Sequence, residues 1–262
     1  MRRQAVRAMA RVMPYLPDSW VFAALRKWVD AIPDEEGRVF CRRLIVAAKD
    51  MMRRVSPNCR RRIVESFAIN NYFVGLPKRH SFKRGTGFDA PYLIVVSPTT
   101  RCNLRCQGCY AGDYAGATDM PRQLLERVIG EARDLGIYFI TLSGGECFLR
   151  DDLLDLFRTF SDCYFQVYTN GTLITEPMAA RLADAGNVLP AISVDGFEAE
   201  TDARRGRGTF AKVLRAMAAL VREGVPFGYA AMATRLNNDL LVSDEFVDFW
   251  QARGCFIGWY FG

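Results

Sequence analysis

Residues 92–110 read YLIVVSPTTRCNLRCQGCY, an apolar run that leads directly into a polar loop with three cysteines. A continuous apolar run such as Tyr92–Val96 is typical of a strand buried on both faces of a parallel sheet. In parallel α/β folds, functional groups gather at the carboxyl ends of the strands. The sequence therefore predicts a functional loop at the end of the first strand of such a sheet.

The rest of the chain alternates apolar runs with amphipathic helical patterns. Further strands are expected at residues 137–142, 164–168, 188–194, 227–233 and 256–261, with helices between them. Six strands joined by five helices are typical of parallel βαβ units with right-handed crossovers. Periodicity alone leaves open whether such a sheet closes into a barrel. Because the chain stops on its sixth strand without a following helix, we expect its C-terminal end to be truncated.

Charge divides the chain in two. Residues 1–90 hold 19 Lys and Arg against 8 Asp and Glu, whereas residues 91–262 hold 16 against 21. Such asymmetry usually means two bodies with different surfaces. We therefore expect a basic, mainly helical module over residues 1–85 and an α/β domain over residues 86–262, with a linker at residues 76–87.

The N-terminal module shows helical patterns at Trp20–Trp28 and Val39–Met52, separated by prolines. Its basic and aromatic residues are compatible with contact to nucleic-acid phosphates or peripheral contact with an anionic membrane surface. They are also compatible with a solvated appendage that packs on the main domain, which is the favoured interpretation. No known nucleic-acid-binding motif occurs, so a nucleic-acid partner is not expected.

Composition excludes several classes of protein. No apolar run approaches the ~20 residues of a membrane-spanning helix, and Arg7 and Arg11 interrupt any signal-peptide stretch. Eight cysteines without an export signal favour reduced thiols in the cytoplasm. The single histidine, His80, argues against a Ser-His-Asp triad and most histidine-based metal sites.

The three cysteines Cys102, Cys106 and Cys109 have the spacing C-x3-C-x2-C, which lets one loop surround a metal centre. A zinc site requires four ligands, and no fourth is evident. A 4Fe–4S cluster has four irons, so three cysteines leave one iron open to a substrate or cofactor. Polar, glycine-bearing segments follow the next three strands and are expected at the same edge: Ser143–Glu146, Thr169–Thr172 and Ser193–Gly196.

The segment Thr100–Tyr110 resembles the signature of the radical S-adenosylmethionine (radical SAM) superfamily. Within it, residues 90–262 most resemble the branch that contains the molybdenum-cofactor cyclase and the SPASM-type enzymes that modify peptides. The resemblance implies a partial (β/α)6 TIM-like barrel of parallel strands, preceded here by the basic helical extension. It also implies two cofactors, a 4Fe–4S cluster and S-adenosylmethionine.

The resemblance carries roles to individual residues. Cys102, Cys106 and Cys109 would each ligate one iron, and the amino and carboxylate groups of S-adenosylmethionine would chelate the fourth. Gly144, Gly145 and Glu146 match the motif that binds the methionine amino group. The remaining cofactor-binding candidates are Thr169 and Asn170 facing the cofactor, Ser193 and Asp195 near the ribose and carboxylate, Tyr110 near the adenine, and an arginine of residues 204–205 at the carboxylate.

Two positions depart from the family pattern. Gly108 replaces an aromatic residue that often precedes the third cysteine, so a contact there would be through the backbone. Cys147 follows the Gly-Gly-Glu segment where proline is common. Its thiol is a candidate hydrogen donor or extra ligand, although simple packing is the favoured interpretation.

The implied reaction is reductive cleavage of S-adenosylmethionine to a 5′-deoxyadenosyl radical, which abstracts hydrogen from an unidentified substrate. An external one-electron reductant, flavodoxin- or ferredoxin-like, is implied as a partner. Modification of a peptide or protein is favoured as the function. The alternatives are an enzyme that modifies a small metabolite, cofactor or lipid, and a truncated cluster-binding protein without turnover.

Overall fold

The computed structural model describes residues 4, 8, 12–112, 116 and 118–262, so Arg7 and Arg11 lie outside the described residues. Contacts divide the chain into two compact units, Met1–Val55 and Ser56–Gly262. The division therefore falls before the boundary expected at residues 85 and 86. Its cause is a run of helices after residue 56 that packs on the sheet domain.

The N-terminal unit is helical in its described elements, which are η1 (Met13–Tyr15), α2 (Asp18–Asp30) and α3 (Glu35–Arg54). Lys49 of α3 is almost fully buried, and its ammonium pairs with the Asp18 carboxylate at the start of α2. The same ammonium donates a hydrogen bond to the Leu16 carbonyl at 2.7 Å. One buried cation thus connects the two longer helices of this unit.

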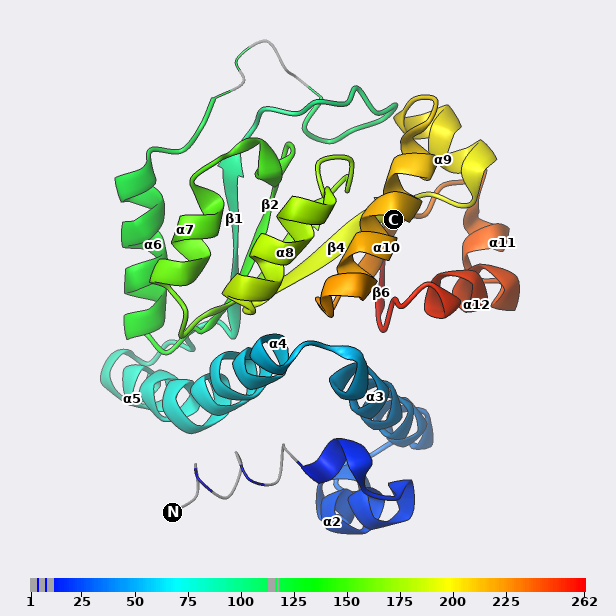
Figure 1. The fold of residues 1–262 in the computed structure, drawn as a ribbon. Coiled ribbons are helices and arrows are strands. Elements are labelled where there is room, and N and C mark those ends of the chain that lie inside the picture. Colours follow the sequence, from blue (N-terminus) through cyan, green and yellow to red (C-terminus); the bar gives the residue numbers. More distant parts are fainter. Residues whose placement is uncertain (1–3, 5–7, 9–11, 113–115, 117) are drawn as a thin grey trace. The chain divides into compact units, whose positions relative to one another are not determined.

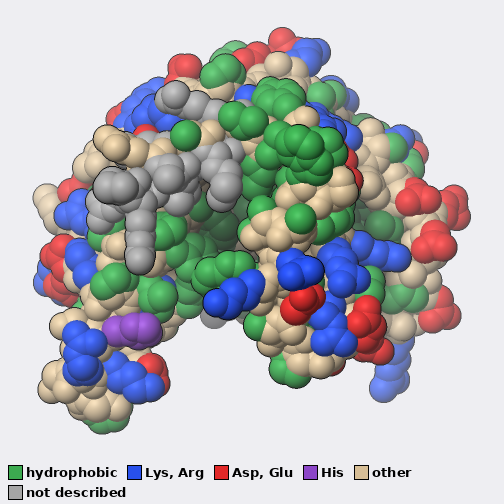
Figure 2. Space-filling model, turned by 90° about the horizontal axis from the view of Figure 1, so that it is seen from below, with side chains coloured by type: hydrophobic (Ala, Val, Ile, Leu, Met, Phe, Trp, Pro, Cys, Tyr) green, Lys and Arg blue, Asp and Glu red, His purple; other side chains and the backbone are tan. Residues whose placement is uncertain are grey.

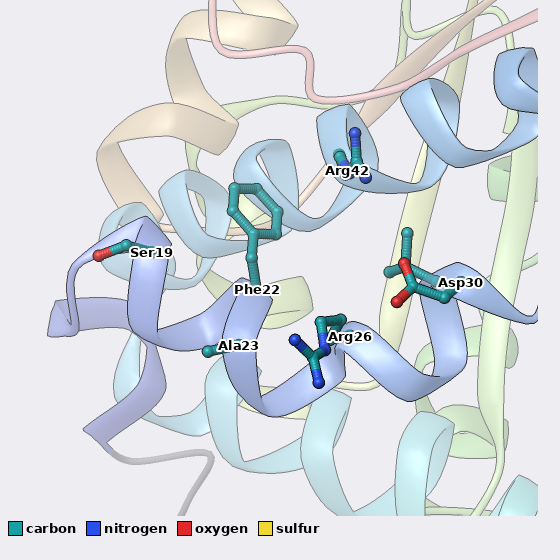
Figure 3. Close-up of a pocket in the computed structure, with 7 residues that line it drawn as sticks. Ser19, Phe22, Ala23, Arg26, Asp30 and Arg42 are labelled. Atoms are coloured by element: carbon teal, nitrogen blue, oxygen red, sulfur yellow. The ribbon is translucent and has the colours of Figure 1, made fainter.

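The helical pattern expected at Trp20–Trp28 belongs to α2, but its apolar side chains do not all face the interior. Val21 and Val29 are buried, but Trp20 and Trp28 are exposed. A pocket of about 510 Å³ lies along α2 and reaches Arg42 of α3 (Figure 3). None of the predicted site residues lines it. Basic and hydrophobic side chains both reach the surface on the face of the molecule that Figure 2 shows.

The second unit begins with three consecutive helical segments, α4 (Pro57–Arg62), the π-helix η2 (Ile63–Gly75) and α5 (Leu76–Thr86). In Figure 1, α4 and α5 lie below the sheet, at the amino ends of the strands. Ser66 and Asn70 donate hydrogen bonds of 2.8 Å to the carbonyls of Ser161 and Asp162, just before the third strand. Asn58 donates to the Ala183 carbonyl, near the fourth strand, at 2.9 Å. We call these three segments the base helices.

The linker predicted at residues 76–87 is wrong, because this stretch forms α5. Pro77 stands in its first turn, where a missing N–H has no cost, and Gly87 ends it with φ of 78°. Arg79 is buried and donates hydrogen bonds to the carbonyls of Gly136 and Asn71. The basic composition that suggested a linker therefore includes a cation that belongs to the interior.

The described strands form one parallel sheet in the order β1-β2-β3-β4-β5-β6. Each strand pairs with the next along the chain, and β1 and β6 are not paired with each other. This arrangement is an open arc of a barrel, which confirms the partial (β/α)6 fold. The strands are β1 (Leu93–Thr99), β2 (Phe139–Gly144), β3 (Tyr164–Thr169), β4 (Val188–Val194), β5 (Gly228–Met232) and β6 (Gly258–Phe261).

Helices cover the outer face of the sheet, where α6, α7, α8 and α10 lie side by side in Figure 1. Leu125, Ile129 and Phe157 of this layer are fully buried, and the ring of Phe157 lies 4.9 Å from that of Phe165 on β3. The helices are α6 (Arg122–Asp134), α7 (Leu153–Thr159), α8 (Glu176–Ala185), α9 (Glu198–Arg205), α10 (Thr209–Glu223), α11 (Asn238–Leu241) and α12 (Asp244–Ala252), with the 3-10 turn η3 (Cys147–Leu149).

The inner face of the arc is less covered than the sequence predicted. Tyr168 of β3 contacts the rings of Trp259 and Phe261 of β6, with centroids 6.2 and 5.6 Å apart. Since β3 and β6 are not neighbours in the sheet, these contacts cross the interior of the arc. Val95 of β1 is 62% exposed, so the expectation that this strand is buried on both faces is wrong. β1 is an end strand of the open sheet, and among the described residues Val95 and Ser97 on its inner side are exposed.

Candidate functional site

The cysteine loop, residues 100–112, leaves the carboxyl end of β1 as predicted. Cys102, Cys106 and Cys109 are free thiols of intermediate exposure, and the Cys109 N–H donates to the Cys106 carbonyl at 3.3 Å. Burial raises the pKa of the Cys102 and Cys106 thiols. Binding of a metal centre to these thiols would therefore release protons.

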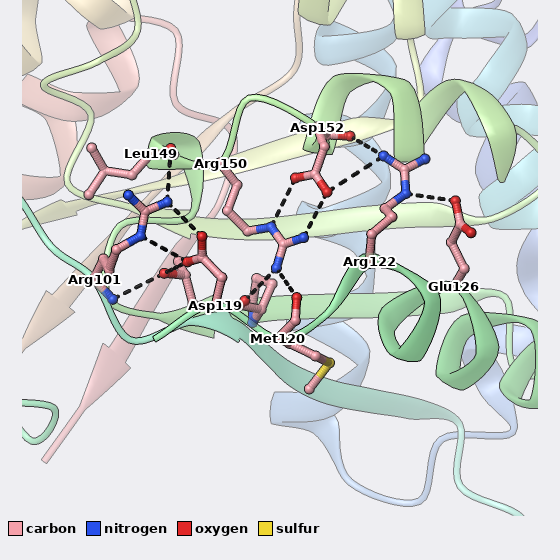
Figure 4. A network of polar contacts seen from close by, with 10 residues as sticks. Arg101, Asp119, Met120, Arg122, Glu126, Leu149, Arg150 and Asp152 are labelled. Carbon is pink, nitrogen blue, oxygen red and sulfur yellow. Dashed lines mark hydrogen bonds and ion pairs between the residues drawn. The ribbon is translucent and has the colours of Figure 1, made fainter. Parts of the chain in front are cut away.

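A network of polar contacts closes the base of this loop (Figure 4). Arg101 donates two hydrogen bonds to the carboxylate of Asp119, at 2.9 and 2.8 Å, and the Thr99 hydroxyl donates a third at 2.6 Å. The guanidinium of Arg101 is the main cause that lowers the pKa of Asp119. The Thr100 N–H also donates to the Thr118 carbonyl at 2.9 Å. These hydrogen bonds, of which those from Arg101 are charge-assisted, thus hold the start of the loop to Thr118 and Asp119 further along the chain.

Arg150 continues this network below the loop. Its guanidinium donates to the carbonyls of Pro98 and Met120, at 2.8 and 2.5 Å, and binds the Asp152 carboxylate through two nitrogens. Arg122 donates to the Asp152 carbonyl at 2.8 Å. These contacts attach the end of β1 and the start of α6 to the turn that follows β2.

Gly144 and Gly145 let the end of β2 approach the backbone of the cysteine loop. A Cβ atom on Gly145 would lie 2.0 Å from the Arg101 carbonyl oxygen, and one on Gly144 would lie 2.4 Å from that of Thr99. The N–H of Glu146 donates to the same Arg101 carbonyl at 2.8 Å. The two glycines are therefore required by close contact between two backbones.

The carboxylate of Glu146 joins the tips of β2 and β3. It is fully buried and accepts hydrogen bonds from the Asn170 N–H at 2.7 Å, the Thr169 hydroxyl at 2.8 Å and the Phe148 N–H at 3.1 Å. Burial raises the pKa of Glu146, and the three hydrogen bonds oppose that rise. The carboxylate contacts Thr169 and Asn170, two other residues that the sequence predicted for the site.

Asn170 connects β3 to the cysteine loop. Its side-chain amide donates to the Asn103 side-chain oxygen at 2.8 Å and lies 4.0 Å from the Cys102 sulfur. Its side-chain oxygen accepts from the Thr172 N–H and hydroxyl, at 2.9 and 2.7 Å. The Asn103 amide donates to the Thr172 hydroxyl at 2.8 Å. Asn103, Asn170 and Thr172 form a closed set of hydrogen bonds beside the first cysteine, which we call the asparagine hub.

Tyr110 reaches from the end of the cysteine loop to the tip of β2. Its hydroxyl lies 3.0 Å from the Ser143 hydroxyl and accepts from the Gly144 N–H at 3.2 Å. The ring is mostly exposed. Its open face is available to a planar ligand at this edge of the sheet.

The residues predicted after β4 divide into two environments. Ser193 is half-buried on β4, whereas Asp195 is buried and pairs with Arg204 at 2.9 Å and Arg205 at 2.5 Å. The Arg204 carbonyl accepts from the Gln107 N–H of the cysteine loop at 2.9 Å. Asp195 therefore pairs with the two arginines of α9. Burial raises the pKa of Cys106, and the charges of these arginines oppose that rise.

Cys147 is buried, and its thiol donates to the Ser143 carbonyl at 3.5 Å. Burial raises the pKa of this thiol well above its ordinary value. This environment matches the packing interpretation.

The structure brings the predicted residues of β1, β2 and β3 into one hydrogen-bonded assembly, with Asp195 connected to it through α9. Three further residues of the site had no role assigned from the sequence: Asn103, Thr172 and Asp119, of which Thr172 belongs to a segment expected at this edge. Asn103 had a usable signal, since it is the only amide among the three residues between the first two cysteines. Asp119 had none, because its partner Arg101 lies 18 residues away.

The donor set fits a 4Fe–4S cluster. Within the described residues, no three His, Cys, Asp or Glu side chains are grouped so as to hold a single metal ion. Three free thiols of one loop provide a ligand for each of three irons of a cluster, whereas the thiol of nearby Cys147 is buried and donates to the Ser143 carbonyl. The site thus matches a cluster with an open iron better than a closed zinc site.

A partial parallel barrel with three cysteines at the carboxyl end of its first strand defines a class of iron–sulfur enzymes. The family model of the radical SAM superfamily matches residues 96–239. The chain therefore belongs to the radical SAM superfamily, whose cofactors are a 4Fe–4S cluster and S-adenosylmethionine.

Curated relatives include members of the expected branch. Over 168 residues the chain is 34% identical to mycofactocin maturase MftC of Mycolicibacterium smegmatis, covering 61% of this chain and 42% of the relative. It is 32% identical to a pre-heme d1 synthase of Dinoroseobacter shibae, covering 67% and 44%. A "Probable GTP 3',8-cyclase" of Methanothermobacter marburgensis is 34% identical over 112 residues, covering 41% and 36%. The chain spans less than half the length of these relatives.

Solved structures share the fold. Native anSMEcpe with bound AdoMet matches with a TM-score of 0.56 and 21% identity, covering 65% of this chain and 51% of that one. SuiB of Streptococcus suis bound to S-adenosylmethionine matches with a TM-score of 0.58 and 19% identity, covering 68% and 42%. Among the described residues, no helix has the length and apolar character needed to cross a membrane.

Proposed function

We propose that residues 56–262 form the core of a radical SAM enzyme that cleaves S-adenosylmethionine and abstracts a hydrogen atom from a peptide or protein. The observation that carries this proposal is the position of the cysteine loop. The asparagine hub holds its Cys102 end at the tip of β3, and the hydrogen bond from the Glu146 N–H to the Arg101 carbonyl holds it at the tip of β2. When bound, the cluster and S-adenosylmethionine supply a 5′-deoxyadenosyl radical by one-electron reductive cleavage. A flavodoxin- or ferredoxin-like protein would supply the electron.

In this proposal the protein positions the cofactors and excludes water. Cys102, Cys106 and Cys109 ligate three irons, and the backbone of Gly144 and Gly145 faces the methionine amino group. The buried carboxylate of Glu146 acts by holding the strand tips, since its hydrogen bonds go to Asn170, Thr169 and Phe148. The assignments of the other candidates follow the family pattern: Thr169 and Asn170 at the cofactor, Ser193 and Asp195 near the ribose and carboxylate, and Tyr110 near the adenine.

Two similarities support a peptide substrate. MftC is named a maturase, and a SuiB structure that matches the fold is bound to the precursor peptide SuiA. The pre-heme d1 synthase and an AdoMet-dependent heme synthase of Methanosarcina barkeri, 32% identical over 155 residues, support the alternative of a small cofactor-like substrate. A search for the substrate must therefore include both peptides and small cofactor-like molecules.

The activity is tested by anaerobic reconstitution with iron and sulfide, reduction with dithionite, and quantification of 5′-deoxyadenosine after S-adenosylmethionine is added. The matched control replaces Cys102, Cys106 and Cys109 by Ala and should hold no cluster. A second control, Cys41→Ala, should keep the iron, because Cys41 lies outside the sheet domain. Product equal to that of the triple variant, in a chain with a full cluster, would contradict the proposal and support the truncated protein without turnover.

We also propose that the basic N-terminal module makes peripheral contact with anionic membranes. Its support is the exposure of Trp20, Trp28 and Phe40 on helices rich in arginine. Sedimentation with phosphatidylserine vesicles should carry the protein down at low salt and release it at high salt. Equal sedimentation with phosphatidylcholine vesicles would contradict the proposal.

A further inference from the structure

The pocket along α2 contains none of the residues assigned to the radical SAM site (Figure 3). The described residues that line it all belong to the N-terminal unit, and they come from α2 and, with Arg42, from α3. Its volume of about 510 Å³ falls within the range of roughly 300–1,000 Å³ that is typical of pockets for small ligands. The N-terminal unit therefore has a candidate binding site of its own.

Contacts between α2 and α3 fix this pocket at both of its ends. At one end, Lys49 of α3 binds the start of α2, and at the other, Arg38 of α3 donates to the Ile32 carbonyl after α2 at 2.7 Å. Between these contacts, α2 presents the small side chains of Ser19 and Ala23. Larger side chains at these two positions would fill the space, so the pocket follows from the sequence of α2.

Two positive charges and one negative charge line the pocket, and their side chains are open to a ligand. Among the described residues, neither Arg26 nor Asp30 makes a hydrogen bond or an ion pair. Arg42 has a long contact of 4.0 Å with the carboxylate of Glu35, and these side chains are 48% and 65% exposed. Ion pairs with such exposure contribute at most about 1 kcal/mol, so a ligand can replace this one at little cost.

We infer that this pocket binds the head group of an anionic lipid that carries a phosphodiester, a carboxylate and an ammonium group, as phosphatidylserine does. The inference rests on the proposed membrane contact of this module and names the lipid. Each anionic group would pair with Arg26 or Arg42, because a planar guanidinium binds phosphate or carboxylate through two N–H groups. The ammonium group would pair with Asp30. Phosphatidylcholine lacks the carboxylate and phosphatidylglycerol lacks the ammonium group, so each would leave one charge of the pocket unpaired.

Apolar side chains beside these charges favour a lipid over a soluble head group. Phe22 and the buried Val29 line the pocket, where they would contact the glycerol and the first acyl carbons. Trp20 and Trp28 on α2 and Phe40 on α3 are exposed, and such aromatic residues are typical of a membrane interface. A soluble phosphoserine ester would use the polar side chains and leave these apolar ones in water.

The test uses short-chain lipids below their micelle concentration, so that binding does not require a membrane. Dihexanoyl phosphatidylserine, phosphatidylglycerol and phosphatidylcholine are titrated into the full chain, and binding is followed by the broadening of their phosphorus NMR signals. Phosphatidylserine should bind at least about tenfold more tightly than either of the others. Glycerophosphoserine, which has the same head group without acyl chains, should bind more weakly than the lipid. Equal affinity would identify a site for a soluble anion and overturn the inference.

The double variant Arg26→Gln with Arg42→Gln should weaken binding of dihexanoyl phosphatidylserine about tenfold. The matched control is Lys27→Gln with Arg43→Gln, which removes the same charge from the neighbouring, exposed positions of the same two helices, outside the pocket. This control should bind the lipid as tightly as the wild type. Equal weakening in both double variants would show a diffuse attraction to positive charge and overturn the inference.

Asp30→Asn tests the selectivity of the pocket. It should weaken binding of phosphatidylserine and strengthen binding of phosphatidylglycerol, so that the preference between the two lipids is lost. Misfolding would weaken both, and an unchanged preference would contradict the inferred site. Sedimentation with phosphatidylserine vesicles measures the proposed membrane contact separately. Protein that sediments with these vesicles but binds no short-chain lipid would keep that contact and overturn the pocket as its cause.

Discussion

The carboxylate of Glu146 has no route to solvent, and its three donors come from two backbone N–H groups and one hydroxyl. Hydrogen bonds from Asn170, Thr169 and Phe148 stabilise this carboxylate, and the positive charge of Arg205 adds to them. The neighbouring glycines, Gly144 and Gly145, act through the absence of a side chain, which lets the end of β2 approach the cysteine loop. Gly145 in particular permits an approach to the Arg101 carbonyl that no other residue type allows.

This close approach gives the first prediction. Gly145→Ala should lower the free energy of unfolding by about 1–3 kcal/mol, because the added methyl group must push the cysteine loop from the end of β2. The variant should also bind less iron on reconstitution. Gly130→Ala is the matched control: a Cβ there meets no atom within 4 Å, and the change should stabilise α6 by about 0.5–1 kcal/mol. Equal stability of the two variants, measured by urea unfolding, would refute this account of Gly145.

The asparagine hub gives the second prediction. Asn170→Asp replaces the amide that donates to Asn103 by an oxygen, which would face the Asn103 oxygen and the Cys102 sulfur. Residues that orient metal ligands typically contribute roughly 10–100-fold to affinity, so the variant should lose iron to a chelator correspondingly faster. Asn238→Asp, an exposed amide at the start of α11, should lose iron at the wild-type rate. A wild-type rate in Asn170→Asp would show that the hub does not support the cluster.

At the scale of elements, predictability from sequence followed the strength of the local pattern. The expected strand 188–194 matches β4 at both ends, because its apolar run is continuous. The helix expected before the next strand corresponds to α10, whose apolar residues form a stripe. Helix α9 was not predicted, because its sequence EAETDARR has no apolar stripe. Its contacts are polar instead: Arg204 pairs with Asp195, and the Arg204 carbonyl accepts a hydrogen bond from the cysteine loop. The three cysteines and Gly-Gly-Glu were predicted from sequence as parts of one site, and the structure places Glu146 in hydrogen-bond contact with the cysteine loop. Asn103 was missed because its partners Asn170 and Thr172 are distant in the chain.

The ion pair between Arg101 and Asp119 at the start of the cysteine loop gives a prediction on the pH dependence of stability. The Arg101 guanidinium lowers the pKa of Asp119 below its ordinary value of 3.8, so this pair stabilises the fold above that pH. The contribution is lost as the pH falls through the lowered pKa. At pH 7 and low salt, Asp119→Asn should therefore cost about 1 kcal/mol, and the difference from wild type should disappear in acid. Asp155→Asn is the control, since Asp155 pairs with Arg158 on the exposed surface of α7. It should change the midpoint of urea unfolding less than Asp119→Asn does at every pH. A deficit that persisted unchanged in acid would argue against the ion pair.

At the scale of the whole molecule, composition and contacts place the division of the chain differently. Charge favoured a boundary near residue 85, whereas the contacts place the base helices with the sheet. Charge reports the surface of a segment, and the base helices are basic outside while Ser66, Asn70 and Arg79 bind carbonyls of the sheet domain. Such long-range hydrogen bonds leave no periodic trace in the sequence.

Two shortened chains separate these boundaries. Residues 56–262 should fold, melt cooperatively and bind the same amount of iron as the full chain, because they keep every hydrogen bond of the base helices to the sheet domain. Residues 86–262 should aggregate or melt without cooperativity, since Phe139 and Tyr164 lose the ring of Phe67. Circular dichroism and calorimetry distinguish the outcomes. A cooperative transition in residues 86–262 would restore the boundary expected from charge.

The asparagine hub has a consequence for the energetics of cluster assembly. A mobile loop would lose about 1–2 kcal/mol of backbone conformational entropy for each residue that iron fixes. Here Asn103 and its neighbours are ordered by bonds to β2 and β3, so that entropy is lost when the domain folds. The loop is preorganised, and metal binding bears little of the cost of ordering it. The affinity for iron is thereby set by the hydrogen bonds of two neighbouring strands as well as by the three thiolates.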